Sequence, residues 1–438
     1  MKQVYILLSI CLICTINSLQ AQTVSTLAGS TSSGSANGTG AAASFDDPFG
    51  VAVDGAGNIY VADMQNNEIR KIVISSGAVT TIAGYKAGGS NNGIGTAAGF
   101  DLTYGVAYDG KGNLFIADAS NNMIRQMVLS SGVVSTLAGS GSTGSADGTG
   151  IAASFSAPCA VATDGINVYV ADRNNNEIRQ VVIATGVVTT LAGSTAAGST
   201  NGTGGAARFN YPFGVAVDAY GNLYVGDYYN NEIRKIVIST GVVTTFAGST
   251  TSGSADGVGA SASFSNPVGV CVYNHDMFVA DYTNNKIRHI DLYNATVSTV
   301  AGTGAQGTTN GAGSSATFTY PTGVICDGTN LYVADEYNYE IREITGIPLG
   351  VNEVKDNNSI SVYPNPTNEM LNIQLAKPMQ CNATLKIMDM TGREIAMQSI
   401  TAMQSSLEVN VGYLPVGVYF ISLQNADGSV LMDKFVKQ

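Results

Sequence analysis

The sequence predicts an all-β protein: a six-bladed β-propeller whose ring is closed by the N-terminal strand, followed by a small C-terminal β-sandwich. Three observations carry this prediction: a six-fold repeat, four short β runs in each copy, and a fourth-strand segment isolated at the N-terminus. The repeated line is usually Ala-Asp, two variable residues, a turn that is mostly Asn-Asn, one residue and Ile-Arg, and it recurs every 54 or 55 residues. Such a period indicates one supersecondary unit copied along the chain. The Asp and the Arg seven positions later form the pairs Asp63 and Arg70, Asp118 and Arg125, Asp172 and Arg179, Asp227 and Arg234, Asp281 and Arg288, and Asp335 and Arg342.

Each copy contains four short β runs separated by tight turns. In the first copy the runs are Gly50–Asp54, Asn58–Asp63, Glu68–Ile74 and Val79–Ala83. The residues between them are rich in Gly, Asn, Asp and Ser, which favour tight turns. Each copy is therefore expected to fold as a four-stranded antiparallel meander. Six such sheets can bury their faces by stacking around an axis.

The ends of the repeat region predict how the ring closes. The fourth-strand pattern, which ends in Ala-Gly, first occurs at Val24–Gly29, ahead of any first strand. The sixth copy reaches Ile344 without a convincing fourth strand before Pro348. We therefore expect Val24–Ala28 to complete the blade formed by residues 322–344. This pairing would also cover a sheet edge that otherwise invites aggregation.

The N-terminus has the features of a secretory signal peptide over residues 1–21. Lys2 precedes an apolar run from Val4 to Thr15 that is too short to span a membrane, and Ala21 is a small residue at the expected cleavage site. No other segment is long and apolar enough to be a transmembrane helix. We expect the propeller to occupy residues 22–346.

The repeat period stops near Asn357, and the composition changes. Residues 347–358 are expected to be a linker, and residues 359–438 a second domain. Seven short β runs follow in that domain, which predicts a small β-sandwich.

The repeats resemble the NHL-repeat family of propellers. The matching lines are Pro-x-Gly-Val-Ala-Val-Asp at Pro48–Asp54, Gly-Asn-Ile-Tyr-Val-Ala-Asp at Gly57–Asp63, and Asn-Asn-Glu-Ile-Arg-Lys-Ile at Asn66–Ile72. The resemblance implies the propeller fold over about residues 23–346. It implies no single activity, because NHL propellers mostly bind partners and only some relatives are enzymes.

The last eighty residues resemble the C-terminal sorting domain of the type IX secretion system of Bacteroidetes. The matching motifs include Val362-Tyr-Pro-Asn-Pro-Thr367, the Asp389-Met-Thr-Gly392 turn, Leu414-Pro-Val-Gly-Val-Tyr-Phe420 and the terminal Lys434-Phe-Val-Lys437. The resemblance implies that the secretion machinery recognises residues 359–438. The protein is then expected to be secreted or displayed on the outer cell surface.

Strand direction predicts one loop-rich face on the propeller. The turn between the second and third strands emerges on the same face as the connection from the fourth strand to the next blade, because strands alternate in direction. Each connection is a Gly-, Ser-, Ala- and Thr-rich segment, and loops on a rigid scaffold commonly carry binding function. Each also holds one Phe, expected to fill the gap between blades: Phe45, Phe100, Phe155, Phe209, Phe264 and Phe318.

The repeated polar residues favour a structural role. The Asp can accept backbone N–H groups of the turn, and the Arg can pair with a carboxylate or a carbonyl between blades. An anion-binding surface lined by the six Arg is the alternative.

Each connection carries an Asn-Gly or Asp-Gly dipeptide, and one carboxylate at most per loop is too few oxygen ligands for a calcium site. We therefore predict hairpin-like turns there, with no metal site and no cofactor: Asn37, Asn92, Asp147, Asn201, Asp256 and Asn310.

One asymmetry between the blades predicts a binding surface. The turns after the Asp are rich in Tyr in blades four to six only, and consecutive blades are neighbours. Aromatic rings with a polar tip suit sugars, peptides and proteins. The candidate ligand-binding residues, expected to form an arc on the loop-rich face, are Tyr228, Tyr229, Tyr282, Tyr337 and Tyr339.

The sequence offers little for catalysis or for nucleic acid. It has only two histidines, His275 and His289, and no nucleophile elbow or phosphate-binding Gly loop. The net charge of −12 argues against nucleic acid, which needs a basic surface. We predict no catalytic residues, and a secreted or surface binding protein whose partner is an unknown extracellular protein or glycan. The alternatives are a hydrolase or lyase with acidic residues at the axis, and a structural surface component.

Overall fold

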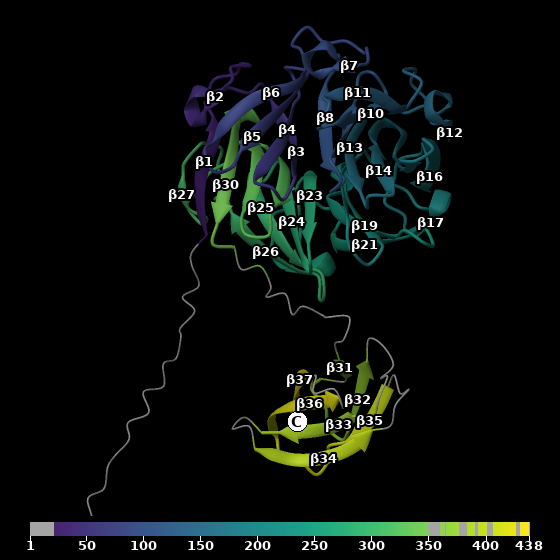
Figure 1. The fold of residues 1–438 in the computed structure, drawn as a ribbon, viewed down its shortest axis with the longest axis vertical. Helices are drawn as coiled ribbons and strands as arrows, with labels where there is room; N and C mark the ends of the chain where they lie inside the picture. The colour runs from purple at the N-terminus through teal and green to yellow at the C-terminus, as the bar shows by residue number, and fades with distance from the viewer. Residues whose placement is uncertain are drawn as a thin grey trace, which may run out of the picture. The chain divides into compact units, whose positions relative to one another are not determined.

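The computed structural model describes residues 22–347, 349, 360–363, 365–375, 383–389, 393–400, 406–425 and 430–437. The chain divides into two compact units, Met1–Gly350 and Val351–Gln438. Figure 1 shows each unit as an assembly of strands, and the described residues contain no α-helix. The predicted signal peptide, residues 1–21, lies outside the described residues, as does most of the predicted linker. No helix in the described part of the chain is long and apolar enough to cross a membrane.

Unit one is a six-bladed propeller, as predicted. The first strand of each blade faces the axis, and these strands contact one another in a closed ring. They are β3 (Pro48–Val53), β8 (Thr103–Tyr108), β13 (Pro158–Thr163), β18 (Pro212–Val217), β23 (Pro267–Tyr273) and β28 (Pro321–Cys326). The second strands, which end at the repeated Asp, are β4 (Asn58–Asp63), β9 (Asn113–Asp118), β14 (Asn167–Asp172), β19 (Asn222–Asp227), β24 (Asp276–Asp281) and β29 (Leu331–Asp335).

The outer strands of each blade follow in antiparallel order. The third strands, which carry the repeated Arg, are β5 (Glu68–Val73), β10 (Met123–Val128), β15 (Glu177–Val182), β20 (Glu232–Val237), β25 (Lys286–Asp291) and β30 (Glu340–Thr345). The fourth strands are β6 (Ala78–Gly84), β11 (Val133–Ala138), β16 (Val187–Gly193), β21 (Val242–Gly248), β26 (Thr296–Ala301) and β1 (Thr23–Gly29).

The N-terminal strand closes the ring, as the sequence predicted. Strand β1 pairs antiparallel with β30, with Val24 opposite Ile344. Figure 1 shows β1 beside β30 on the same blade. The last blade is therefore built from both ends of the repeat region.

Each blade has a fifth strand that the sequence analysis missed. Two residues of the Gly-rich connection pair with the fourth strand and cover its outer edge. These short strands are β2 (Gly38–Thr39), β7 (Gly93–Ile94), β12 (Gly148–Thr149), β17 (Gly202–Thr203), β22 (Gly257–Val258) and β27 (Gly311–Ala312). Five of them lead into a 3-10 turn: η1 (Gly40–Ala42), η2 (Gly95–Ala97), η3 (Gly150–Ala152), η5 (Gly204–Ala206) and η7 (Gly259–Ser261). The connections thus shield the edges of the blades.

The turns after the repeated Asp pack on these connections. In three blades the turn is a 3-10 helix: η4 (Arg173–Asn175), η6 (Tyr228–Asn230) and η8 (Glu336–Asn338). In the first blade the N–H of Met64 donates to the carbonyl of Asp47, and that of Gln65 to Asp46. The two kinds of loop therefore share one face, as strand direction predicted.

Unit two is a small sandwich of two antiparallel sheets. One sheet has the order β31 (Ile360–Tyr363), β32 (Met370–Leu375) and β35 (Ser406–Asn410). The other has the order β34 (Glu394–Ile400), β33 (Ala383–Met388), β36 (Gly417–Asn425) and β37 (Val430–Lys437). Both sheets contribute to one apolar core that includes Leu371, Ile373, Ile387, Ile421 and Phe435. All seven β runs predicted for this region are strands.

Candidate functional site

The repeated Asp and Arg form a buried ion pair in every blade. Both side chains are fully buried in all six pairs. The Nη1 of the Arg donates to the Oδ2 of the Asp over 2.6–2.9 Å. The Oδ1 of the Asp accepts the N–H of the residue after the repeated Phe over 2.7–2.8 Å. Buried charges are tolerated when they are paired and hydrogen-bonded in this way.

Each guanidinium has further partners in the Gly-rich connection. Its Nη2 donates to the side-chain oxygen of the Asn-Gly or Asp-Gly dipeptide over 2.7–3.0 Å. Its plane lies over the ring of the repeated Phe, with centroid distances of 5.2–5.3 Å. The dipeptides were expected to be simple turns, and their link to the Arg was missed. Because the six guanidiniums are buried and both terminal nitrogens of each are hydrogen-bonded, while only Nε lacks a partner, we propose a structural role for them.

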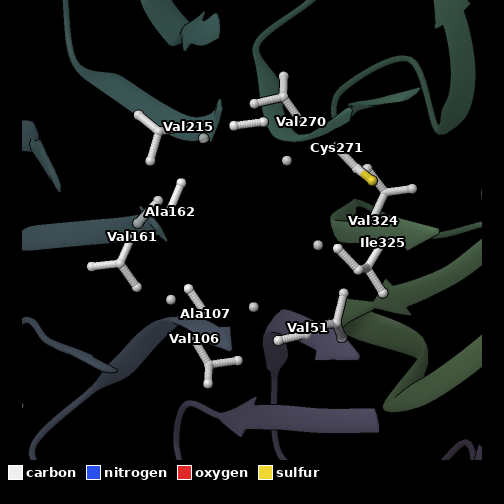
Figure 2. Close-up of a pocket in the computed structure, with 18 of the residues that line it drawn as sticks. Val51, Val106, Ala107, Val161, Ala162, Val215, Val270, Cys271, Val324 and Ile325 are labelled. Carbon is white, nitrogen blue, oxygen red and sulfur yellow. The ribbon is translucent and has the colours of Figure 1, made fainter. Parts of the chain in front are cut away.

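The six inner strands surround an axial cavity of about 210 Å³ (Figure 2). Apart from a few Cys, Thr and Tyr side chains, its lining is apolar, and the described lining contains no Asp, Glu or His. The hypothesis of an enzyme with acidic residues at the axis gains no support from this channel. The valines that line it at equivalent positions are Val51, Val106, Val161, Val215, Val270 and Val324.

Aromatic rings fill the end of the channel at the loop-rich face. Phe49 and Phe213 hold the same position in blades one and four, which lie opposite each other in a ring of six. Their rings stack with centroids 5.4 Å apart, and Tyr104 packs edge-on against Phe49 at 4.8 Å. Tyr228 and Tyr282 are partly buried and pack against the cluster that contains Phe49 and Phe213. A ligand on this face would meet an aromatic floor.

Four of the five predicted tyrosines lie along this surface. Tyr228 contacts Tyr229 with ring centroids 4.9 Å apart, and Tyr282 at 6.3 Å. Tyr229 and Tyr337 are exposed, whereas Tyr228 and Tyr282 are half-buried. Tyr339 takes a left-handed backbone conformation after η8, with φ of 58°, and does not share in the ring contacts that join the others.

Two tyrosines that the sequence analysis missed connect these rings. Tyr320 lies 4.8 Å from Tyr282 and 5.4 Å from Tyr337, between ring centroids. Tyr211 lies 5.1 Å from Tyr229. Both precede the Pro that opens an inner strand, and both have positive φ, at 62° and 56°. Their shared place before that Pro was a signal available in the sequence. We call the six residues Tyr211, Tyr228, Tyr229, Tyr282, Tyr320 and Tyr337 the tyrosine arc.

A buried acid, also missed, lies beside the arc. Glu336 is only 5% exposed, and its Oε2 has no hydrogen-bond partner. Burial, reinforced by the charge of Asp47, raises the pKa of Glu336 to about 8, and the interaction with Tyr282 opposes the rise. Burial also raises the pKa of Asp47. Burial and nearby charges including Glu336 raise the pKa of Tyr228 to about 12. Burial and neighbouring charges thus favour the neutral forms of these groups.

Arg173 provides a positive group on the other side of the axis. It holds the position in blade three that Glu336 holds in blade six, and these blades are opposite. Its guanidinium lies 5.0, 4.9 and 5.4 Å from the ring centroids of Tyr104, Tyr211 and Phe213. Its Nε has no hydrogen-bond partner. Aromatic faces, which carry partial negative charge, stabilise such a cation.

The two histidines lie away from the arc. His289 belongs to β25, with its Nε2 2.7 Å from Oδ1 of Asp276. His275 lies in the turn between β23 and β24, on the face opposite the loops, and stacks on Tyr293 at 4.0 Å. Its Nε2 lies 3.0 Å from the Oη of Tyr220. Within the described ranges, no group of three or more His, Cys, Asp or Glu could hold a metal ion.

Comparison with known families agrees with both units. Residues 361–438 match the model of the secretion system C-terminal sorting domain, and residues 209–236 match that of the NHL repeat. The protein SUPPRESSOR OF QUENCHING 1, chloroplastic, of Arabidopsis thaliana is 30% identical over 267 residues, 57% of this chain and 25% of that protein. NHL repeat-containing protein 2 of Bos taurus is 29% identical over 300 residues, 58% of this chain and 40% of that protein. The matches therefore span less than half of each relative's length.

A solved structure supports the fold. A structural genomics protein of unknown function from Bacteroides thetaiotaomicron superposes with a TM-score of 0.58 and 22% identity, covering 74% of this chain and 76% of that chain. At this identity the likeness concerns the fold alone. The six sheets and the match over residues 209–236 describe a β-propeller with NHL-type repeats, and the match over residues 361–438 describes a secretion system C-terminal sorting domain, which indicates export to the cell surface or release from the cell.

Proposed function

We propose that the propeller is an extracellular recognition module that binds a partner through its loop-rich face. The observation that carries this proposal is the tyrosine arc, which runs without a break over blades four to six. Tyr229 and Tyr337 are 55% and 46% exposed, so their rings are available to a partner. Tyr combines a large apolar ring with a hydrogen-bonding tip, and such residues carry much of the affinity of protein interfaces.

The surroundings of the arc support the same function. The rings rest on short turns held by buried Asp–Arg pairs, so a partner would meet a surface that is already ordered. Preorganised surfaces lose less conformational entropy on binding. Export places the propeller outside the cell, where its partner would be an extracellular molecule.

The test is a binding screen of the full exported chain against polysaccharides and surface-protein extracts. The Tyr229→Ala, Tyr337→Ala double variant would run beside the wild type. The control is a Tyr220→Ala, Tyr293→Ala double variant, because these tyrosines are 64% and 71% exposed on the opposite face.

We expect the arc variant to lose at least tenfold in affinity, since alanine changes at aromatic hot spots commonly cost about 2 kcal/mol or more. The control should bind as the wild type does. Two results would reject the loop-rich face as the binding surface: an equal loss of affinity in both double variants, or an arc variant that binds as tightly as the wild type.

A further inference from the structure

The corner between blades six and one breaks the symmetry of the ring in its charge. The residue after the repeated Asp is Met, Ala, Arg, Tyr and Tyr in the first five blades, and Glu336 in the sixth. The residue before the inner-strand Pro or Thr is Leu, Ala, Tyr, Asn and Tyr in the other blades, and Asp47 in the first. Asp47 directly precedes β3 and Glu336 directly follows β29, and these two strands contact each other, so the two acids lie at the same corner of the loop-rich face.

Aromatic side chains surround this acidic corner. Tyr337 follows Glu336 in η8, and the charge of Glu336 contributes to the raised pKa of Tyr228, Tyr282 and Tyr337. Tyr320 packs between two of them. Glu336 Oε2 is buried and has no hydrogen-bond partner, although a buried carboxylate oxygen normally has one. The corner therefore combines aromatic rings with a buried acid whose Oε2 has no hydrogen-bond partner.

The opposite side of the same face shows what such an arrangement binds. There Arg173 lies over three aromatic rings at 4.9–5.4 Å. The protein's own fold thus stabilises a guanidinium on aromatic rings at the position equivalent to Glu336. At the Glu336 corner the rings are present, and a carboxyl takes the place of the cation.

We propose that this corner binds a cationic side chain, an ammonium or a guanidinium, of a protein partner, with the cation against Tyr282 and Tyr337 and with Glu336 as its counter-charge. The inference rests on the proposed recognition function and names its ligand chemistry. Aromatic rings attract cations, and a desolvated site strengthens that attraction. The net charge of −12 adds long-range attraction for a basic partner. An anionic ligand would meet two carboxyls, so the corner selects against it.

The test uses model side chains with the full chain. Nα-acetyl-lysine methylamide and Nα-acetyl-arginine methylamide are titrated, with Nα-acetyl-norleucine methylamide as the uncharged analogue. The readout is the ring signals in NMR spectra of protein with labelled tyrosines. The titrations are run at pH 9, above the pKa of about 8 of Glu336, where its carboxyl is ionised and Glu336→Gln removes the charge with little change of shape. Glu177→Gln is the matched control, because Glu177 Oε2 is also buried without a hydrogen-bond partner but lies beside Arg179 and outside the arc.

We expect the lysine or the arginine compound to shift the signals of Tyr282 and Tyr337 and the norleucine compound to leave them unchanged. Glu336→Gln should weaken cation binding roughly fivefold or more, as expected for a partly buried cation site, and Glu177→Gln should not. The relative strength of the two cationic compounds tells an ammonium from a guanidinium site.

Two results would overturn the proposal: equal shifts with norleucine, or unchanged cation affinity in Glu336→Gln. Its failure can be told from that of the recognition function. If Tyr229→Ala, Tyr337→Ala abolishes partner binding while Glu336→Gln leaves it intact, the face recognises a partner but not through a cation. If cations bind and no partner does, the chemistry of the corner stands without the recognition function.

Discussion

At the scale of residues, the side chains that repeat in every blade hold the loops in place, whereas those that differ between blades distinguish one part of the face from another. Each repeated guanidinium hydrogen-bonds through its two terminal nitrogens to an Asp and to an Asn or Asp of the connection, and it lies over a Phe ring. At Arg234 these partners are Asp227, Asn201 and Phe209. No donor of its two terminal nitrogens is left facing solvent, because the side chain is fully buried. Such a group can hold loops together but has nothing to offer a ligand. Glu336 and Arg173, which break the period, also hold buried polar atoms without hydrogen-bond partners, as do the Nε atoms of the six repeated Arg.

Glu336 should make stability depend on pH. Burial raises its pKa from an ordinary 4.5 to about 8. The folded state therefore holds the proton more tightly than the unfolded state, so the contribution is full below about pH 4.5 and is lost as the pH rises towards 8. We predict that Glu336→Gln and the wild type have similar stability near pH 5, and that the variant is more stable by roughly 2–5 kcal/mol near pH 9. Urea unfolding at both pH values measures this difference.

The control for that experiment is Asp101→Asn, an exposed carboxyl of the same propeller. Its effect on stability should be small at both pH values. A stability difference between Glu336→Gln and wild type that stays constant from pH 5 to pH 9 would show that Glu336 does not titrate in this range.

The residues of the site were only partly predictable. The sequence placed Tyr228, Tyr229, Tyr282 and Tyr337 on the loop-rich face because they follow a repeated Asp whose place in the blade is known. It missed Glu336 because a single acid in a turn has no distinctive pattern. Its significance comes from neighbours in adjacent blades, and a period along the chain does not state which side chains meet across blades.

At the scale of elements, glycine sets how closely the inner strands approach. Five of the six inner strands carry Gly at their third position, and β13 carries Ala160 instead. A Cβ on Gly214 would overlap the carbonyl oxygen of Val268 in the next blade and lie 3.0 Å from the nitrogen of Val270. The ring of inner strands is thus too tight for a side chain at most of these positions.

We predict that Gly214→Ala destabilises the propeller by roughly 1–3 kcal/mol, because the overlap is with backbone atoms that cannot move aside easily. The comparison is Ala160→Gly, which removes a Cβ at the equivalent place and should cost at most about 1 kcal/mol. Thermal unfolding of both variants gives the two values. If Gly214→Ala proves as stable as the wild type, the inner ring has more room than these contacts imply.

The strands themselves were largely predictable, and the fifth strand of each blade shows why some were not. The four main runs alternate and are bounded by turn residues, so their existence follows from pattern. Gly38–Thr39 and its copies have only two residues within a Gly- and Ser-rich stretch. They become strands because the neighbouring β6 and its equivalents present an unpaired edge, and that tertiary condition leaves no local pattern in the sequence.

At the scale of the whole molecule, the ring depends on a strand that is far from its blade in sequence. Thr23–Gly29 pairs with Glu340–Thr345, so the last blade joins residues more than three hundred positions apart. The other five blades draw all four main strands from one continuous segment. Opening the ring at β1 would leave the edge of β30 unpaired, whereas the sandwich of unit two has its own core.

This dependence gives a test of closure that separates it from ordinary loss of core packing. Val24 and Val79 hold the same position in the fourth strands of blades six and one, and they are 1% and 2% exposed. Two variants, Val24→Asp and Val79→Asp, each bury an unpaired charge, which should lower the free energy of unfolding by several kcal/mol in either place. We predict that Val24→Asp removes hydrogen-exchange protection from β30, because the closing strand can leave independently of the rest of the ring.

The control variant, Val79→Asp, should instead lower the protection of β5 and leave β30 protected, because β6 stays tethered to its own blade by the turn at Ser76–Gly77. Strands β33 and β36 of unit two should exchange as in the wild type in both variants. If the two changes deprotect β30 equally, the propeller opens as one cooperative body, and the N-terminal strand is no weaker a point than any other outer strand.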